Sequence, residues 1–157
     1  MKMDFKKIML VVCDFDGVMT DNKVIMDENG KESVVCNRGD GLGIDRLKEN
    51  DIEVICLSKE RNKVVEARCR KVKIECCQGI DDKPELFKKE VSKRGLTMDQ
   101  VCFIGNDVND IGCLKEAGIG VATNDAYPDV KKVADFITKT NGGEGVVREV
   151  SDLILKG

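Results

Sequence analysis

Residues 8–21 read IMLVVCDFDGVMTD, an apolar run that ends directly in two carboxylates, Asp14 and Asp16. The apolar part, Ile8–Cys13, has the length of a buried β-strand bounded by polar residues. It is too short for the core of a secretory signal or for a membrane span. We therefore expect a soluble, cytoplasmic chain without a membrane partner, whose first strand delivers two acidic side chains to the edge of a sheet.

Short apolar runs alternate with helical patterns along the rest of the chain. Further strands are predicted at Glu53–Leu57, Val101–Ile104 and Gly118–Ala122, and a short one around Cys76-Cys77, to which we assign no role. Helices are predicted at about residues 41–49, 60–71, 83–94, 107–117 and 145–155. This alternation predicts an α/β fold with a doubly wound, Rossmann-like parallel sheet.

Residues 22–37 interrupt the alternation. They carry two β-prone runs around Glu28-Asn29-Gly30, which is a signal for a β-hairpin. No other insertion is long enough for a second domain. We therefore expect a single domain over residues 1–157, with a hairpin at about 22–37 that projects from it.

The composition excludes several classes of function. The chain has 157 residues with 26 basic and 29 acidic side chains, and its net charge of -3 offers no basic surface for nucleic acid. Histidine is absent, so Ser-His-Asp and Cys-His catalysis and histidine zinc sites are excluded. The eight cysteines include no C-x-x-C pair and fall mostly in apolar runs, as expected for reduced thiols in a core.

Polar residues follow the predicted strands at the edge where ligands bind in open α/β sheets. Asp14 and Asp16 follow the first strand, and Ser58 follows the second. An aspartate pair alone is more commonly a turn or a helix cap. With a nearby lysine and further carboxylates, however, one aspartate can attack phosphorus while another protonates the leaving oxygen, and Mg²⁺ prefers such oxygen ligands.

The order of these motifs resembles the haloacid dehalogenase superfamily of phosphatases over nearly the whole chain. The motifs are DFDGVMTD at 14–21, Ser58, Lys83 and GNDVND at 105–110. The resemblance implies that Asp14 is the nucleophile, that Asp16 is the general acid and base, and that Ser58 and Lys83 hold the phosphate. It also implies the cofactor Mg²⁺, with ligands drawn from Asp14, Asp16, Asn106, Asp107 and Asp110.

Within that superfamily the chain resembles small members that carry a hairpin and no separate cap domain. These are the 3-deoxy-manno-octulosonate 8-phosphate phosphatases, the nonulosonate 9-phosphate phosphatases and a domain of acylneuraminate cytidylyltransferases. The stretches NRGDGLG at 37–43 and GGEGVVRE at 142–149 carry this resemblance. It implies a 2-keto-3-deoxy sugar-acid phosphate as substrate, bound by Thr20, Asn37, Arg38, Asp40, Gly41, Glu60, Arg68 and Lys71. It also implies a homotetramer in which Gly142, Gly143, Gly145 and Arg148 help to close the active site of a neighbouring subunit.

Two departures from the family pattern leave alternatives open. Asn106 stands where an aspartate is usual, so the chain is either a phosphatase with weaker metal affinity or a non-catalytic oligomerisation domain associated with CMP-sugar-acid synthesis. Glu60 stands where octulosonate phosphatases have an arginine, and the predicted helix 60–71 would present Glu60 and Lys71 on one face. These two residues favour a nonulosonate 9-phosphate over an octulosonate 8-phosphate. A phosphoacceptor signalling domain is disfavoured, because its acceptor aspartate would have to follow the strand that here ends in Leu57-Ser58.

Overall fold

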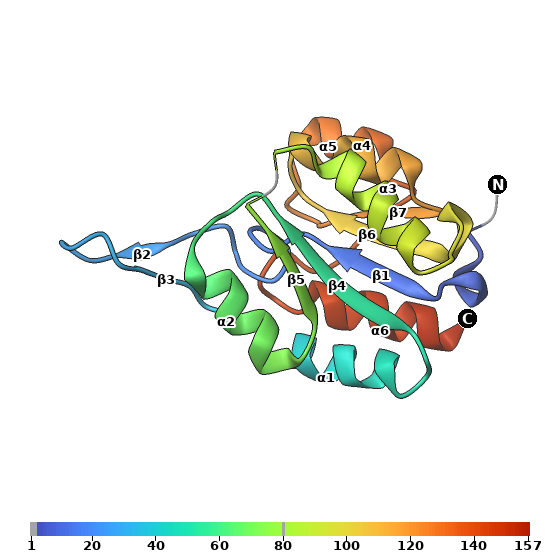
Figure 1. The fold of residues 1–157 in the computed structure, drawn as a ribbon, viewed down its shortest axis with the longest axis horizontal. Helices are drawn as coiled ribbons and strands as arrows, with labels where there is room; N and C mark the ends of the chain where they lie inside the picture. Colours follow the sequence, from blue (N-terminus) through green and yellow to red (C-terminus); the bar gives the residue numbers. More distant parts are fainter. Residues whose placement is uncertain (1–2, 80) are drawn as a thin grey trace.

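The computed structural model describes residues 3–79 and 81–157, and its main feature is a six-stranded sheet in which all neighbouring strands run parallel (Figure 1). Side by side, the strands are β5 (Glu75–Gln78), β4 (Glu53–Ser58), β1 (Leu10–Cys13), β6 (Val101–Gly105), β7 (Ile119–Ala122) and β8 (Phe136–Ile137). The chain winds outward from β1 in both directions, which confirms the predicted doubly wound α/β fold.

Helices cover both faces of this sheet (Figure 1). One face packs against α1 (Arg38–Lys48), α2 (Lys63–Val72) and α6 (Val146–Lys156), and the other against α3 (Lys83–Lys93), α4 (Ile111–Glu116) and α5 (Pro128–Val133). The central strand serves both cores, because its side chains alternate between the faces. Val11 and Cys13 lie in the first apolar cluster, and Leu10 and Val12 lie in the second.

The structure corrects the bounds of several predicted elements. The helix predicted from residue 60 begins at Lys63, because the side chain of Asn62 accepts the backbone N–H of Val64 at 3.0 Å and acts as its N-cap. Glu60 therefore lies in the loop before α2. The helix predicted at 107–117 is a 3₁₀ turn, Val108–Asp110, followed by the short α4. The short helix α5 and the edge strand β8 were not predicted.

The predicted hairpin is present and projects away from the sheet (Figure 1). Its strands, β2 (Ile25–Met26) and β3 (Glu32–Ser33), are antiparallel, and Gly30 has a positive φ of 79° in the turn between them. At the base of the hairpin, the amide of Asn62 donates to the Glu32 carboxylate at 3.1 Å, which ties the hairpin to the start of α2. No helix within the described residues is long and apolar enough to cross a membrane.

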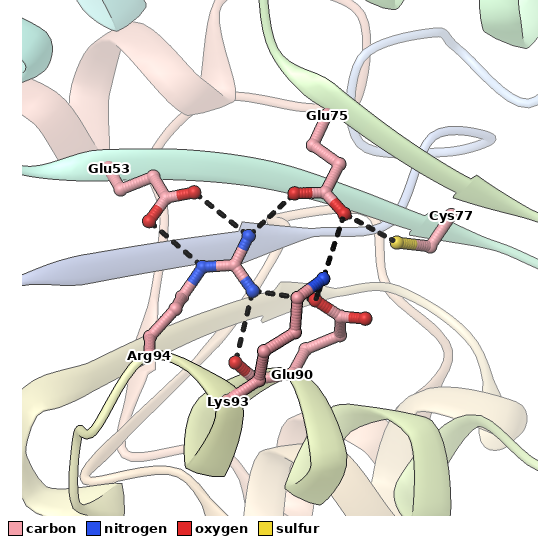
Figure 2. A network of polar contacts seen from close by, with 6 residues as sticks. All are labelled: Glu53, Glu75, Cys77, Glu90, Lys93 and Arg94. Atoms are coloured by element: carbon pink, nitrogen blue, oxygen red, sulfur yellow. Dashed lines mark hydrogen bonds and ion pairs between the residues drawn. The ribbon is translucent and has the colours of Figure 1, made fainter.

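An ionic cluster fastens the end of α3 to the sheet (Figure 2). Arg94 directly follows α3. Its guanidinium donates to both carboxylate oxygens of Glu53 at 2.8 Å and to Glu75 at 2.7 Å. It also donates to Glu90 at 2.6 Å, one turn earlier in the same helix. Glu53 and Glu75 begin β4 and β5, so the cluster fixes the far end of the helix whose first residue is Lys83.

Candidate active site

The carboxyl ends of β1, β4 and β6 meet at a cavity of about 160 Å³. Asp14 and Asp16 enter it from the loop after β1, Ser58 and Glu60 from the end of β4, and the loop after β6 closes it. The complete lining is Asp14, Asp16, Asn22, Ser58, Lys59, Glu60, Asn106, Asp107 and Asn109. The parallel topology thus brings together motifs that are far apart in the sequence.

A buried charged triad lies at the base of this cavity. The ammonium of Lys83 is 3.1 Å from Oδ1 of Asp14 and 2.7 Å from Oδ1 of Asp110. The Lys83 side chain is only 1% exposed, and the Asp110 side chain is fully buried. The other Asp110 oxygen accepts the backbone N–H groups of Asn106 and Asp107 at 3.0 and 3.3 Å. Asp110 therefore orients Lys83 and the loop after β6, and this placement favours a positioning role over the expected role as a metal ligand.

Burial shifts the pKa values of the two leading aspartates upward. The pKa of Asp14 is raised to about 8, chiefly by burial and then by the charge of Asp110, while Lys83 opposes the shift. The pKa of Asp16 is raised by partial burial, then by the carboxylates of Glu60 and Glu32. The two pKa shifts have different consequences. A raised pKa suits Asp16 as a proton donor, whereas Asp14 needs nearby positive charge to react as a carboxylate.

Three oxygen-bearing groups converge on one point of the cavity. The amide of Asn106 lies 2.9 Å from the backbone oxygen of Asp16 and 3.2 Å from Oδ2 of Asp14. Gly17 permits this approach, because a Cβ at that position would overlap the Asn106 amide. One carboxylate oxygen, one side-chain amide oxygen and one backbone carbonyl oxygen are hard ligands of the kind that Mg²⁺ prefers, so these residues fit the ion. Asp107 lines the same cavity while its Oδ1 accepts the N–H of Val108 at 2.7 Å.

Ser58 and Glu60 lie on the opposite wall. Ser58 is only 1% exposed. Its hydroxyl accepts the N–H of Glu60 at 3.1 Å, and this hydrogen bond fixes the loop after β4. The Glu60 carboxylate accepts the N–H groups of Arg61 and Asn62 and faces the cavity. Ser58 is therefore held at the cavity wall, with its proton free to be donated to a ligand.

Three of the expected substrate-binding residues have structural partners instead. Thr20 is fully buried, and its hydroxyl accepts N–H groups of the loop after β1. Asn37 is the N-cap of α1 and accepts the N–H of Gly39 at 2.7 Å. Asp40 is fully buried and accepts the N–H of Arg148 at 3.1 Å, at the start of α6. These contacts favour roles in holding loops and helix ends over contact with a substrate.

Four other expected substrate-binding residues gather in a separate groove of about 380 Å³ between α1 and α2: Arg38, Gly41, Arg68 and Lys71. The expectation that Glu60 and Lys71 share a helix face is wrong, because Glu60 precedes α2 and lines the catalytic cavity. Within the described part of this one chain, the groove and the catalytic cavity have no lining residue in common.

The late glycine motif packs inside its own chain. Gly142 and Gly143 lie against the loop after β1, where a Cβ on Gly142 would overlap the carbonyl of Gly17. The N–H of Gly143 donates to the carbonyl of Val18 at 3.0 Å. Gly145 is the N-cap of α6 with a φ of 102°, and the side chain of Arg148 donates to Asp152. These contacts anchor the motif to the loop beside Asp16, and its part in closing a neighbouring active site stays a prediction.

Four polar lining residues were not predicted from the sequence. Asn22, Lys59 and Asn109 line the catalytic cavity. Glu32, from the hairpin, joins Asp16 and Glu60 around an adjoining cavity of about 270 Å³ that is completed by Asn22, Val24, Val34 and Val64. Asn22, Lys59 and Asn109 had a sequence signal, since each is next to a predicted motif residue, whereas Glu32 had none.

Known proteins resemble this chain over nearly its whole length. The model of the haloacid dehalogenase-like hydrolases matches residues 74–150. The 3-deoxy-D-manno-octulosonate 8-phosphate phosphatase of Escherichia coli is 36% identical over 151 residues, which are 96% of this chain and 80% of that protein. The Yersinia pestis enzyme of the same name has a crystal structure with a TM-score of 0.94 and 36% identity, covering 97% of this chain and 83% of that one. The structure of the Moraxella catarrhalis enzyme, with a magnesium ion, a phosphate ion and KDO, gives a TM-score of 0.93 at 33% identity, with coverages of 97% and 88%.

Proposed function

We propose that this chain, a phosphatase that belongs to the haloacid dehalogenase-like hydrolases, removes the terminal phosphate of a 2-keto-3-deoxy sugar acid with the aid of Mg²⁺. The observation that carries the proposal is the setting of Asp14. Its carboxylate pairs with the buried Lys83 through one oxygen, and its other oxygen faces the Asn106 amide, which also lies against the backbone oxygen of Asp16. An attacking carboxylate flanked by positive charge and oxygen ligands is the arrangement that phosphoryl transfer requires.

In the first step, an oxygen of Asp14 attacks phosphorus and forms an aspartyl-phosphate. The bond between phosphorus and the sugar oxygen breaks, and Asp16 gives its proton to that oxygen. In the second step, Asp16 accepts a proton from the water that attacks phosphorus, which releases inorganic phosphate and restores Asp14. The raised pKa of Asp16 supports this assignment, because an acid must hold its proton until the leaving oxygen needs it.

The remaining residues of the cavity hold the phosphoryl group. We assign Lys83 to its negative charge and the Ser58 hydroxyl to one of its oxygens. Mg²⁺, when bound, supplies positive charge that binds the phosphate and lowers the pKa of Asp14. Asp14, the backbone oxygen of Asp16 and Asn106 would be its protein ligands, with Asp107 close by.

The wall beside Asp16 supports a preference for a nonulosonate 9-phosphate over an octulosonate 8-phosphate. Glu60 and Glu32 make this wall acidic. Carboxylates accept hydrogen bonds from the hydroxyl and amide groups of a sugar but repel its carboxylate. The nine-carbon acid carries its carboxylate one carbon farther from the phosphate, so it places less negative charge against Glu60.

We also propose that the enzyme is a homotetramer. The groove of Arg38, Arg68 and Lys71 offers cations for a sugar-acid carboxylate, yet these residues are not in the lining of the chain's own catalytic cavity. In a tetramer they would serve the cavity of a neighbouring chain. Light scattering after size exclusion tests the assembly: a monomer that turns over substrate at full rate would contradict it.

The test is phosphate release in the presence of Mg²⁺ from N-acetylneuraminate 9-phosphate, its deaminated analogue and octulosonate 8-phosphate. We expect turnover with the nine-carbon acids first and complete loss in Asp14→Asn. Asp129→Asn, the same change at an exposed aspartate on α5, is the matched control and should retain turnover. Absence of turnover on all three substrates, from folded protein, would contradict the phosphatase proposal and favour the non-catalytic assembly role.

A further inference from the structure

The Asn106 amide lies between the other two oxygen ligands of the proposed magnesium site. One end of the amide is 2.9 Å from the backbone oxygen of Asp16 and 3.2 Å from Oδ2 of Asp14. Both neighbours are hydrogen-bond acceptors when Asp14 is ionised. Whether the amide presents its nitrogen or its oxygen at that end therefore decides how the three groups interact.

The two orientations have opposite requirements. With the nitrogen inward, Asn106 donates hydrogen bonds to Asp14 and Asp16, and the three groups need no cation between them. With the oxygen inward and Asp14 ionised, three oxygens face one another, and a cation between them stabilises that arrangement. A half-turn of the amide exchanges the two states without a change of volume, because its nitrogen and oxygen are nearly the same size.

The rest of Asn106 is held in place. The residue is only 5% exposed. Its backbone N–H donates to the Asp110 carboxylate at 3.0 Å, and its backbone carbonyl accepts the N–H of Tyr127 at 3.1 Å. Gly17 packs directly against the amide. The backbone of Asn106 is therefore anchored, and a half-turn of the side-chain amide exchanges its two ends without moving that backbone.

We infer that Asn106 competes with Mg²⁺ for Asp14 and Asp16: its amide nitrogen takes the place of the cation, and the ion binds only when the amide turns its oxygen inward. An aspartate at this position cannot donate and has no such alternative. The inference rests on the proposed magnesium site and goes beyond it, because it assigns Asn106 a stabilising role in the protein without the ion. The consequence is a site that stays ordered at low Mg²⁺ and binds the ion with a higher apparent Kd.

Thermal unfolding of the full chain in EDTA and across a Mg²⁺ titration tests this. In EDTA, Asn106→Ala and Asn106→Asp should both unfold about 3–10 °C below the unmodified protein, because two buried acceptors lose their donor. With Mg²⁺, Asn106→Asp should bind at least about tenfold more tightly than the unmodified protein, since it adds a charged ligand. Asn29→Ala and Asn29→Asp, at an exposed position in the turn of the hairpin, are matched controls and should change neither quantity comparably.

The side-chain amide signals of Asn106 in ¹⁵N-labelled protein report the rotation directly. We expect slow exchange with water in EDTA, and a shifted, faster-exchanging signal at saturating Mg²⁺. The inference is overturned if Asn106→Ala is as stable as the unmodified protein in EDTA, or if Mg²⁺ leaves the amide signals unchanged. Failure of the phosphatase proposal would appear separately, as absent phosphate release at saturating Mg²⁺, while the EDTA results would stand.

Discussion

Replacing Lys83 with methionine should strongly destabilise the protein. Lys83 is the buried counter-charge of Asp14 and Asp110, at 3.1 and 2.7 Å. Methionine fills a similar volume but leaves the buried carboxyl groups of Asp14 and Asp110 without a positive counter-charge. Removing one partner of a buried ion pair costs about 3–5 kcal/mol. For a chain of 157 residues this corresponds to a Tm lower by about 10 °C.

The assay is urea unfolding in EDTA, followed by circular dichroism. Lys59→Met is the matched control, because Lys59 is exposed at the rim of the same cavity, and it should change stability by no more than about 0.5 kcal/mol. Adding Asp110→Asn to Lys83→Met should restore part of the loss, since one uncompensated charge disappears. A loss below about 1 kcal/mol in Lys83→Met would refute the buried triad.

Three further changes probe the frame around the site. Burial raises the pKa of Asp40 from 3.8 to about 6. The stability that its protonated form contributes is therefore fully present below pH 3.8 and is lost as the pH rises through 6. Asp40→Asn should flatten this fall in the free energy of unfolding between pH 3.8 and 6. An unchanged slope would contradict the burial of an ionisable Asp40. Gly142→Ala should cost about 2 kcal/mol or more by urea unfolding, because its Cβ would overlap Gly17, whereas Gly41→Ala, with its nearest atoms 3.6 Å away in a helix, should gain about 0.5–1 kcal/mol. Equal effects would refute the packing of the late glycine motif. Arg94→Met should lower the free energy of unfolding by about 2 kcal/mol and reduce Tm accordingly. Lys93→Met, at the exposed neighbouring position, should lower it by much less. Similar losses in the two variants would mean that the cluster in Figure 2 does not hold α3.

The sequence predicts that the proposed catalytic groups lie together, for a physical reason. A buried parallel strand reads as a continuous apolar run, and its carboxyl end is marked by the first polar residues that follow. Asp14, Asp16 and Ser58 each stand at such an end, so their convergence follows from the topology alone. The sequence also singles out the glycines at 142–143, but their spacing does not show that they pack on the loop after Asp16.

The sequence is less informative where one side chain has two available partners. The spacing of Asp110 is equally suitable for a metal ligand and for a partner of Lys83, and only the fold shows the second. The helical pattern extends to residue 60, but the cap formed by Asn62 makes α2 begin at Lys63. Glu60 therefore precedes the helix and shares no helix face with Lys71. The hairpin residue Glu32 approaches Asp16 through tertiary packing, for which the sequence offers no local signal.

The central claim is that Asp14 carries the phosphoryl group during turnover, and trapping that group tests it most directly. The enzyme would be mixed with Mg²⁺ and N-acetylneuraminate 9-phosphate, quenched in acid during turnover, and digested for mass spectrometry of the peptide that contains Asp14. The account predicts a phosphoryl group on Asp14 that disappears when the substrate is exhausted and never forms in Asp14→Asn. Phosphate release that continues without any label on Asp14, or that persists in Asp14→Asn, would contradict it.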